Sequence, residues 1–136
     1  MKILIVGHGE YATGIKSTIK LLTGIDKNID ALNLNDELTH EKYKNIVHEY
    51  VKNNNELVIF ADLTGGAPFQ IASQEVLLNR TNNNQYVVGG VPVGCIFDTV
   101  MNSMVLNTEK DIKYIIKSAI NEITDMISIV SNEQLQ

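Results

Sequence analysis

The strongest constraint on the fold is a regular alternation along the chain between short β-branched runs and longer segments with helical spacing of apolar residues. That order is typical of βαβ units wound around a parallel sheet. The pattern predicts strands at residues 3–6, 29–34, 57–61 and 86–88. It predicts helices over about 11–23 and 39–52, from 68, over 95–105 and from 108. We therefore expect a three-layer, doubly wound α/β fold with a mainly parallel sheet in the common strand order 2-1-3-4.

Length and composition fit one globular domain. The chain has 136 residues, of which 44% are hydrophobic and 20% charged, and these are ordinary values for a soluble domain. Neither an internal repeat nor a linker divides the sequence, so the expected domain covers 1–130 and a polar tail covers 131–136. The apolar start at 2–6 is too short for a signal peptide or a membrane span. We expect a cytoplasmic protein.

Charge and cysteine content exclude several function classes. A net charge of −5 disfavours nucleic acids and anionic membranes as partners, because both require clustered Lys and Arg. The single cysteine, Cys95, rules out an intramolecular disulfide and a cysteine-based metal cluster, and we expect it to be packed as a small hydrophobic residue. His40 and His48 lie in a charged helical segment and are expected at the surface. We expect neither a metal nor a cofactor.

Two turns carry residues suited to chemistry. Gly7-His8-Gly9 follows the first predicted strand, and Asp62 follows the third, just before Gly65-Gly66. In an open parallel sheet, ligands bind beyond the carboxyl ends of the strands, where the strand order reverses. In the order 2-1-3-4 the first and third strands are neighbours at that point. His8 and Asp62 should therefore face each other.

This pairing predicts a phosphohistidine site. An ordinary histidine is largely neutral at neutral pH, so one ring nitrogen is available as a nucleophile. A carboxylate at Asp62 would accept a hydrogen bond from the other ring nitrogen and fix the tautomer. The amides of Gly65, Gly66 and Ala67, leading into a helix at Pro68, would supply N–H groups for a phosphoryl group. Taken singly, His8 could be a solvated loop histidine, Asp62 a turn or N-cap residue, and Gly65-Gly66 a plain turn.

The two turns together resemble the mannose-type enzyme IIA of the phosphoenolpyruvate-dependent sugar phosphotransferase system. The similarity spans about 1–130, and its specific part is Asp62-Leu63-Thr64-Gly65-Gly66-Ala67-Pro68-Phe69. The resemblance implies that His8 is phosphorylated by the carrier HPr and passes the group to enzyme IIB, which serves the permease IIC/IID. Asp62 would orient the ring. The phosphate-binding residues would be Gly9, Thr64, Gly65, Gly66 and Ala67.

The resemblance also implies a homodimer in which a C-terminal antiparallel strand crosses to the other subunit. Residues 126–130 would form that strand, because they are apolar and partly β-branched and precede a polar tail. As a frayed terminus they would expose apolar surface, whereas on a sheet edge they would pair their backbone and bury one face. The alternative is that the last helix continues to Val130 and packs on its own domain.

Departures from the family pattern leave the transported sugar open. Ala67 stands where many members have Ser or Thr, Gln70 where mannose transporters commonly have Asn, and Pro92 where Asn is frequent. Residues 7–14 look somewhat more like the branch for N-acetylgalactosamine and uronic disaccharides. Two other readings share the fold and the histidine: the phosphotransferase subunit of dihydroxyacetone kinase and a regulatory module. A dinucleotide-binding domain is a distant alternative, since Gly7-x-Gly9-x-x-Ala12 fits a relaxed fingerprint with Asp36 downstream, although His8 would crowd the pyrophosphate.

Overall fold

The structure, a computed structural model, describes residues 1–80 and 84–133 as two compact units, the first covering Met1–Val91 and the second beginning at Pro92. The first unit contains β1 (Lys2–His8), α1 (Tyr11–Thr23), β2 (Ile29–Leu34), α2 (His40–Asn53), β3 (Leu57–Ala61), α3 (Ala67–Leu78) and β4 (Gln85–Gly89). The second contains α4 (Val93–Val100), a π-helix (Met101–Val105), α5 (Ile112–Asn121) and α6 (Ile123–Met126).

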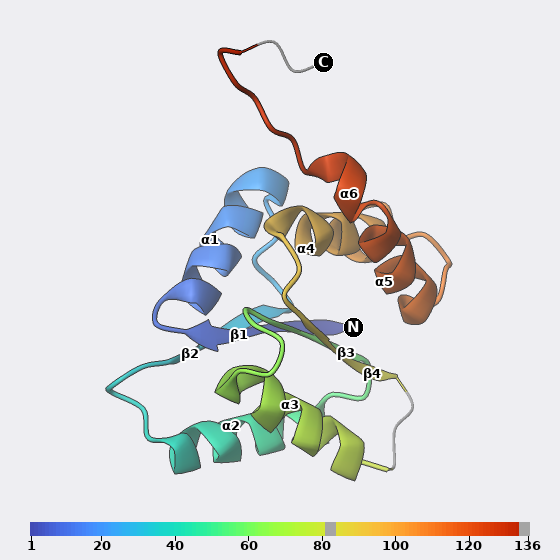
Figure 1. Cartoon of the computed structure of the whole chain (residues 1–136). Helices are drawn as coiled ribbons and strands as arrows, with labels where there is room; N and C mark the ends of the chain where they lie inside the picture. Colours follow the sequence, from blue (N-terminus) through green and yellow to red (C-terminus); the bar gives the residue numbers. More distant parts are fainter. Residues whose placement is uncertain (81–83, 134–136) are drawn as a thin grey trace. The chain divides into compact units, whose positions relative to one another are not determined.

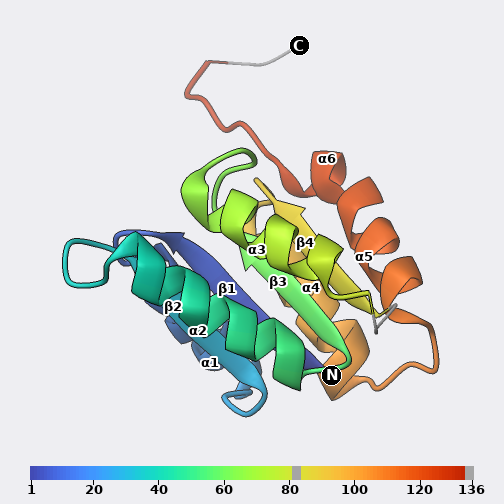
Figure 2. The same cartoon turned by 90° about the horizontal axis from the view of Figure 1, so that it is seen from below.

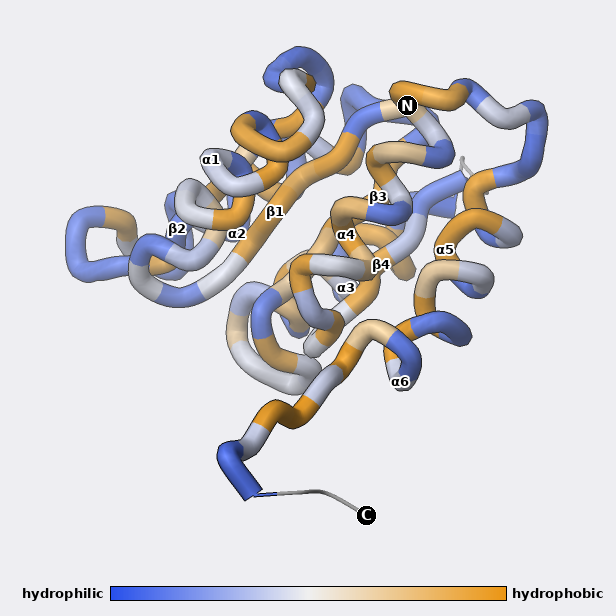
Figure 3. Tube along the Cα trace, turned by 90° about the horizontal axis from the view of Figure 1, so that it is seen from above, coloured by the Kyte–Doolittle hydropathy of each residue, from blue (hydrophilic) through white to orange (hydrophobic). Residues whose placement is uncertain are grey.

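The sheet of the first unit is parallel throughout the described residues, and its strand order is β2-β1-β3-β4, which confirms the expected topology. β1 and β3 are the two central strands. Every residue of β3 is buried, as are residues 3–7 of β1. Figure 3 shows β1 hydrophobic along most of its length. Such continuous apolar runs are typical of parallel strands covered on both faces.

Helices cover both faces of this sheet. α1 lies on one face, and α2 and α3 lie side by side on the other (Figures 1 and 2). α2 buries a stripe at helical spacing, with Tyr43 and Val47 inaccessible to solvent and Val51 nearly so. The helix begins at the N-cap Thr39, whose side chain accepts a hydrogen bond from the Lys42 amide. The first unit is therefore a three-layer, doubly wound α/β structure, as predicted.

The turns after β1 and β3 are tied to the sheet by backbone hydrogen bonds. The Asp62 amide donates to the Val6 carbonyl at 3.2 Å, and the Gly9 amide donates to the Leu34 carbonyl at 2.9 Å. These bonds extend the strand ladders by one step beyond β3 and β1. Both turns therefore start from fixed positions at the carboxyl edge of the sheet.

The second unit differs from the sequence-based expectation in two of its helices. The predicted helix over 95–105 is helical, but its last five residues form a π-helix. The last long helix begins at Ile112 and not near Thr108, because the Asp111 side chain accepts a hydrogen bond from the Tyr114 amide at 2.8 Å and caps it there. Thr108 instead donates its hydroxyl hydrogen to the Asn102 carbonyl.

The C-terminal segment leaves the helical structure after α6. Because α6 ends at Met126, the alternative of a helix continuing to Val130 is wrong. Residues 127–130 have no regular secondary structure, and the side chains of Ile127, Ile129 and Val130 are exposed, with Val130 at 92%. Figure 3 shows hydrophobic stretches in this segment. Exchange of the segment between subunits stays a prediction.

Candidate functional site

His8 and Asp62 are brought together at the carboxyl edge of the sheet. His8 is the last residue of β1, and its side chain is 48% exposed. Asp62 follows the last residue of β3, and its side chain is only 11% exposed. The two strands are hydrogen-bonded neighbours, so residues 54 positions apart in sequence meet at one point.

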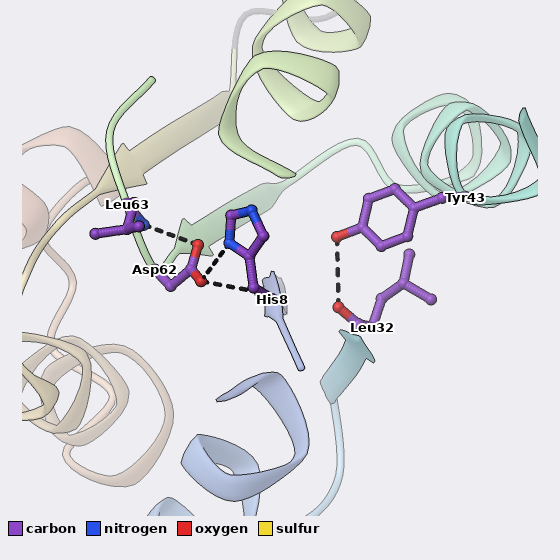
Figure 4. Close-up of polar contacts among 5 residues, drawn as sticks. All are labelled: His8, Leu32, Tyr43, Asp62 and Leu63. Atoms are coloured by element: carbon purple, nitrogen blue, oxygen red, sulfur yellow. Dashed lines mark hydrogen bonds and ion pairs between the residues drawn. The ribbon is translucent and has the colours of Figure 1, made fainter. Parts of the chain in front are cut away.

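The Asp62 carboxylate receives three N–H groups (Figure 4). Its Oδ2 lies 2.8 Å from Nδ1 of the His8 ring and accepts the His8 backbone N–H at 2.9 Å. Its Oδ1 accepts the Leu63 backbone N–H at 2.8 Å. An ionised carboxylate can only accept hydrogen bonds, so the ring proton belongs on Nδ1. Nε2 then carries the lone pair.

The same contacts favour the ionised form of Asp62. Burial alone would raise the pKa of Asp62, but the hydrogen bonds from His8 and Leu63, together with the electrostatic attraction to the His8 ring, lower the pKa more strongly. The net direction is downward from the ordinary value. The carboxylate is therefore charged at neutral pH and can hold the ring in one tautomer.

Two tyrosines that the sequence pattern did not indicate lie near the carboxylate. A Cβ atom built on Gly7 would lie 2.5 Å from Cδ1 of Tyr11 and 3.1 Å from Cγ of Asp62, so the ring and the carboxylate both pack on this glycine. Tyr43 is fully buried, and its hydroxyl donates to the Leu32 carbonyl at 3.4 Å (Figure 4). Burial and, secondarily, the Asp62 charge raise the pKa of both tyrosines, which are therefore neutral at physiological pH.

The predicted phosphate-binding residues lie in the turns after β1 and β3 and at the start of α3, but their amides are not equally available. The Gly66 amide donates to the Leu63 carbonyl at 3.2 Å, and the Gly9 amide donates to Leu34. Both are occupied within the backbone. Ala67 is the first residue of α3, a position whose N–H has no acceptor inside a helix. Pro68 occupies the first turn of that helix, as predicted.

Thr64 and Gly65 form the middle of the same turn. Gly65 has φ +86°, a left-handed conformation that glycine adopts without steric cost. The Thr64 hydroxyl lies against β4, because a Cβ atom built on Gly89 would be 2.7 Å from Thr64 Oγ1 and 2.7 Å from Cδ2 of Phe69. The turn is therefore packed on the end of β4.

A second histidine–carboxylate pair lies elsewhere among the described residues of the first unit. Nδ1 of His48 on α2 is 2.7 Å from Oε2 of Glu75 on α3, and the Glu75 side chain is only 6% exposed. The pair lines a cavity of ≈ 360 Å³ together with Val51, Lys52, Leu78 and Asn79. The His48 side chain is exposed, as expected, but no sequence pattern indicates its buried partner Glu75. In the described residues, no three His, Cys, Asp or Glu side chains gather as a metal site would require.

Cys95 is buried, as expected, and burial raises its pKa to about 11, so the thiol is not activated. Within residues 1–80 and 84–133, no helix combines the length and apolar character needed to cross a membrane.

Comparison with known proteins supports the fold. The phosphotransferase system component EIIA from Streptococcus agalactiae has a TM-score of 0.81 and 21% identity, over 94% of this chain and 95% of that chain. The mannose/sorbose specific IIA subunit from Enterococcus faecalis has a TM-score of 0.78 and 14% identity, over 99% and 98%. The phosphotransferase IIA protein associated with a fucose utilization operon from Streptococcus pneumoniae has a TM-score of 0.71 and 20% identity, over 89% of each chain. No curated protein sequence matches this chain.

The family is established by a sequence match over most of the chain. A family model described as the phosphotransferase system fructose IIA component, EIIA-man, matches residues 2–116. This range contains all the turns of the candidate site. The protein therefore belongs to the EIIA-man family and is a component of the phosphotransferase system.

Proposed function

We propose that the protein is a phosphocarrier that accepts a phosphoryl group from phospho-HPr on His8 and passes it to enzyme IIB. The observation that carries this proposal is the 2.8 Å contact between His8 Nδ1 and a carboxylate that two backbone N–H groups hold in place. The contact orients the ring and leaves Nε2 as the nucleophile. Membership of a family of IIA components supplies the class of partners.

The transfer step needs no group beyond the two proteins. The Nε2 lone pair attacks phosphorus as the bond between phosphorus and the donor breaks, and the electron pair of that bond stays with the donor. Nδ1 keeps its proton, so the phosphorylated ring carries a positive charge beside the Asp62 carboxylate. This ion pair stabilises the intermediate electrostatically. Transfer to enzyme IIB repeats the step with His8 as the leaving group.

The N-terminus of α3 is suited to receive the phosphoryl oxygens. Helix N-termini attract anions through unpaired N–H groups and the positive end of the helix dipole. Among the predicted binding residues, Gly65 and Ala67 are the ones whose amides we assign to this role, since the Gly9 and Gly66 amides are occupied. Ala67 has no hydroxyl group, so the backbone serves alone. Thr64 lies in the same turn.

We propose further that the protein acts in the cytoplasm as a homodimer. The exposed apolar segment after α6 supports the dimer, because it would gain burial and backbone hydrogen bonds on the sheet edge of a second copy. The permease IIC/IID would then be reached only indirectly, through enzyme IIB. The transported sugar does not follow from these residues, since the carrier handles the phosphoryl group only.

The phosphorylation test uses His8→Ala with His40→Ala as the matched control. Incubation with phosphoenolpyruvate, enzyme I and HPr should give the wild-type protein an acid-labile, base-stable phosphoryl adduct. His8→Ala should remain unlabelled, while His40→Ala, which changes an exposed histidine at the start of α2, should be labelled normally. Addition of enzyme IIB should discharge the adduct. Labelling that persists in His8→Ala would refute the assignment.

A further inference from the structure

We propose that Gly66 is a positioning residue for His8, acting through the absence of a side chain. A Cβ atom built on Gly66 would lie 3.0 Å from Cε1 of the His8 ring, closer than ordinary van der Waals contact. The next neighbours of that atom, the carbonyl oxygen and Cβ of Leu63, would be at 3.5 and 3.6 Å. The imidazole ring is therefore what a side chain at position 66 would meet first. This proposal rests on the proposed role of His8.

The backbone conformation at position 66 does not explain why this residue is a glycine. Gly66 has φ −72° and ψ 165°, an extended conformation that any residue adopts. Its neighbour Gly65 has φ +86°, which strongly favours glycine. The two adjacent glycines thus meet different requirements, and only at Gly65 is the requirement conformational. At Gly66 the requirement comes from the ring.

The contact completes the restraint of the imidazole. The hydrogen bond to Asp62 holds Nδ1, but the ring could still tilt about that bond. Cε1 lies between the two ring nitrogens, and the backbone of Gly66 lies against it. The hydrogen bond to Asp62 thus restrains Nδ1, and steric contact with Gly66 restrains Cε1. Because Gly66 is the N-cap of α3, the second nitrogen, Nε2, is placed close to the first turn of that helix.

An alanine at position 66 should disturb this arrangement locally. The His8 backbone is fixed in β1, so the ring must shift by a few tenths of an ångström to accommodate the methyl group. The Nδ1 hydrogen bond then weakens, and Nε2 moves away from its attacking position. Since a displacement of 1 Å can cost about 10²-fold in rate, we expect phosphoryl transfer to slow roughly tenfold.

The experiment compares Gly66→Ala with Gly14→Ala. Gly14 lies within α1, and a Cβ atom there meets nothing within 4 Å, so the control adds the same methyl group in open space. The tautomer of His8 is measured by nitrogen NMR of the ring, and transfer from phospho-HPr by rapid quench. In Gly66→Ala we expect a mixture of tautomers and a lower kcat with KM for phospho-HPr unchanged. Gly14→Ala should match the wild type in both.

A second measurement uses the wild-type protein and does not depend on how the variant folds. A nuclear Overhauser effect should connect the α protons of Gly66 with Hε1 of His8, because one α proton points along the direction in which a Cβ atom would lie 3.0 Å from Cε1. Its absence, or wild-type ring signals and transfer rates in Gly66→Ala, would overturn the proposal. Failure of the wild-type protein to become phosphorylated on His8 would instead refute the proposed function. The contact and tautomer measurements would still decide the positioning role.

Discussion

Asp62→Asn removes the charge at the centre of the site while nearly preserving its shape. The carboxylate accepts three N–H groups, two on Oδ2 from His8 and one on Oδ1 from Leu63. An asparagine has one oxygen and one NH₂ group in place of the two carboxylate oxygens. If the NH₂ group takes the place of Oδ1, it faces the Leu63 amide, and if it takes the place of Oδ2, it faces the His8 amide. At least one of these N–H donors therefore loses its acceptor in either orientation.

The expected loss of stability can be estimated from these hydrogen bonds. A hydrogen bond to a charged group contributes about 1.5–3 kcal/mol, so we expect Asp62→Asn to lower the free energy of unfolding by that amount near neutral pH. Phosphoryl transfer should fall by about 10²–10⁴-fold, the usual effect of removing a group that fixes a catalytic tautomer. Asp36→Asn, in the exposed loop before α2, is the control and should change stability by less than about 0.5 kcal/mol.

The difference in the free energy of unfolding between the wild type and Asp62→Asn should depend on pH. Because the pKa of Asp62 is lowered in the folded state, its contribution is fully present above the unfolded value of about 3.9 and is lost as pH falls through the folded value. Urea unfolding followed by circular dichroism, from neutral pH to about pH 3, should show the wild type losing its advantage over Asp62→Asn in the acidic range. Equal unfolding free energies at neutral pH, combined with wild-type transfer rates, would refute the reasoning.

Three further changes test other parts of the structure. Gly7→Ala should lower the free energy of unfolding by about 1–3 kcal/mol through overpacking against Tyr11, and unchanged thermal unfolding would contradict that contact. Gln85→Ala should cost about 2–4 kcal/mol in urea unfolding, because the buried amide donates to two backbone carbonyls at 2.7 Å and both lose this donor. Truncation after Asp125 should convert the proposed dimer to a monomer in sedimentation velocity, whereas a stable dimer would show that residues 126–130 do not hold the subunits together.

Most of the first unit could be predicted from sequence because its two central strands, β1 and β3, are buried on both faces. The predicted bounds of α1, β2 and β3 agree with the structure residue for residue. Continuous β-branched runs and a helical apolar stripe leave little ambiguity where the core decides the structure. The start of α5 was less determinate, because both Thr108 and Asp111 are residues that cap helices.

The part of the site that could be predicted from sequence is the part that strand order determines. The strand order alone predicts that His8 and Asp62 lie close together, and the structure shows them in contact. The pairing of His48 with Glu75 joins two helices at a separation of 27 residues, and no periodicity signals it. The occupied amide of Gly66 likewise depends on how its turn closes on Leu63. Such contacts are set by tertiary packing, which the pattern of residue types does not encode.

The location of His8 at the end of β1 and of Asp62 directly after β3 has a consequence for local opening of the protein. Fraying of a sheet starts at its edges, and here the edge strands are β2 and β4. The free energy needed to open a region locally ranges from near zero up to the free energy of global unfolding. Central strands require the largest values. The Asp62 amide, which donates to the Val6 carbonyl of β1 across the sheet, should thus exchange with deuterium more slowly than the amides of the edge strands. A partner would therefore meet a site whose backbone opens less readily than the edge of the sheet.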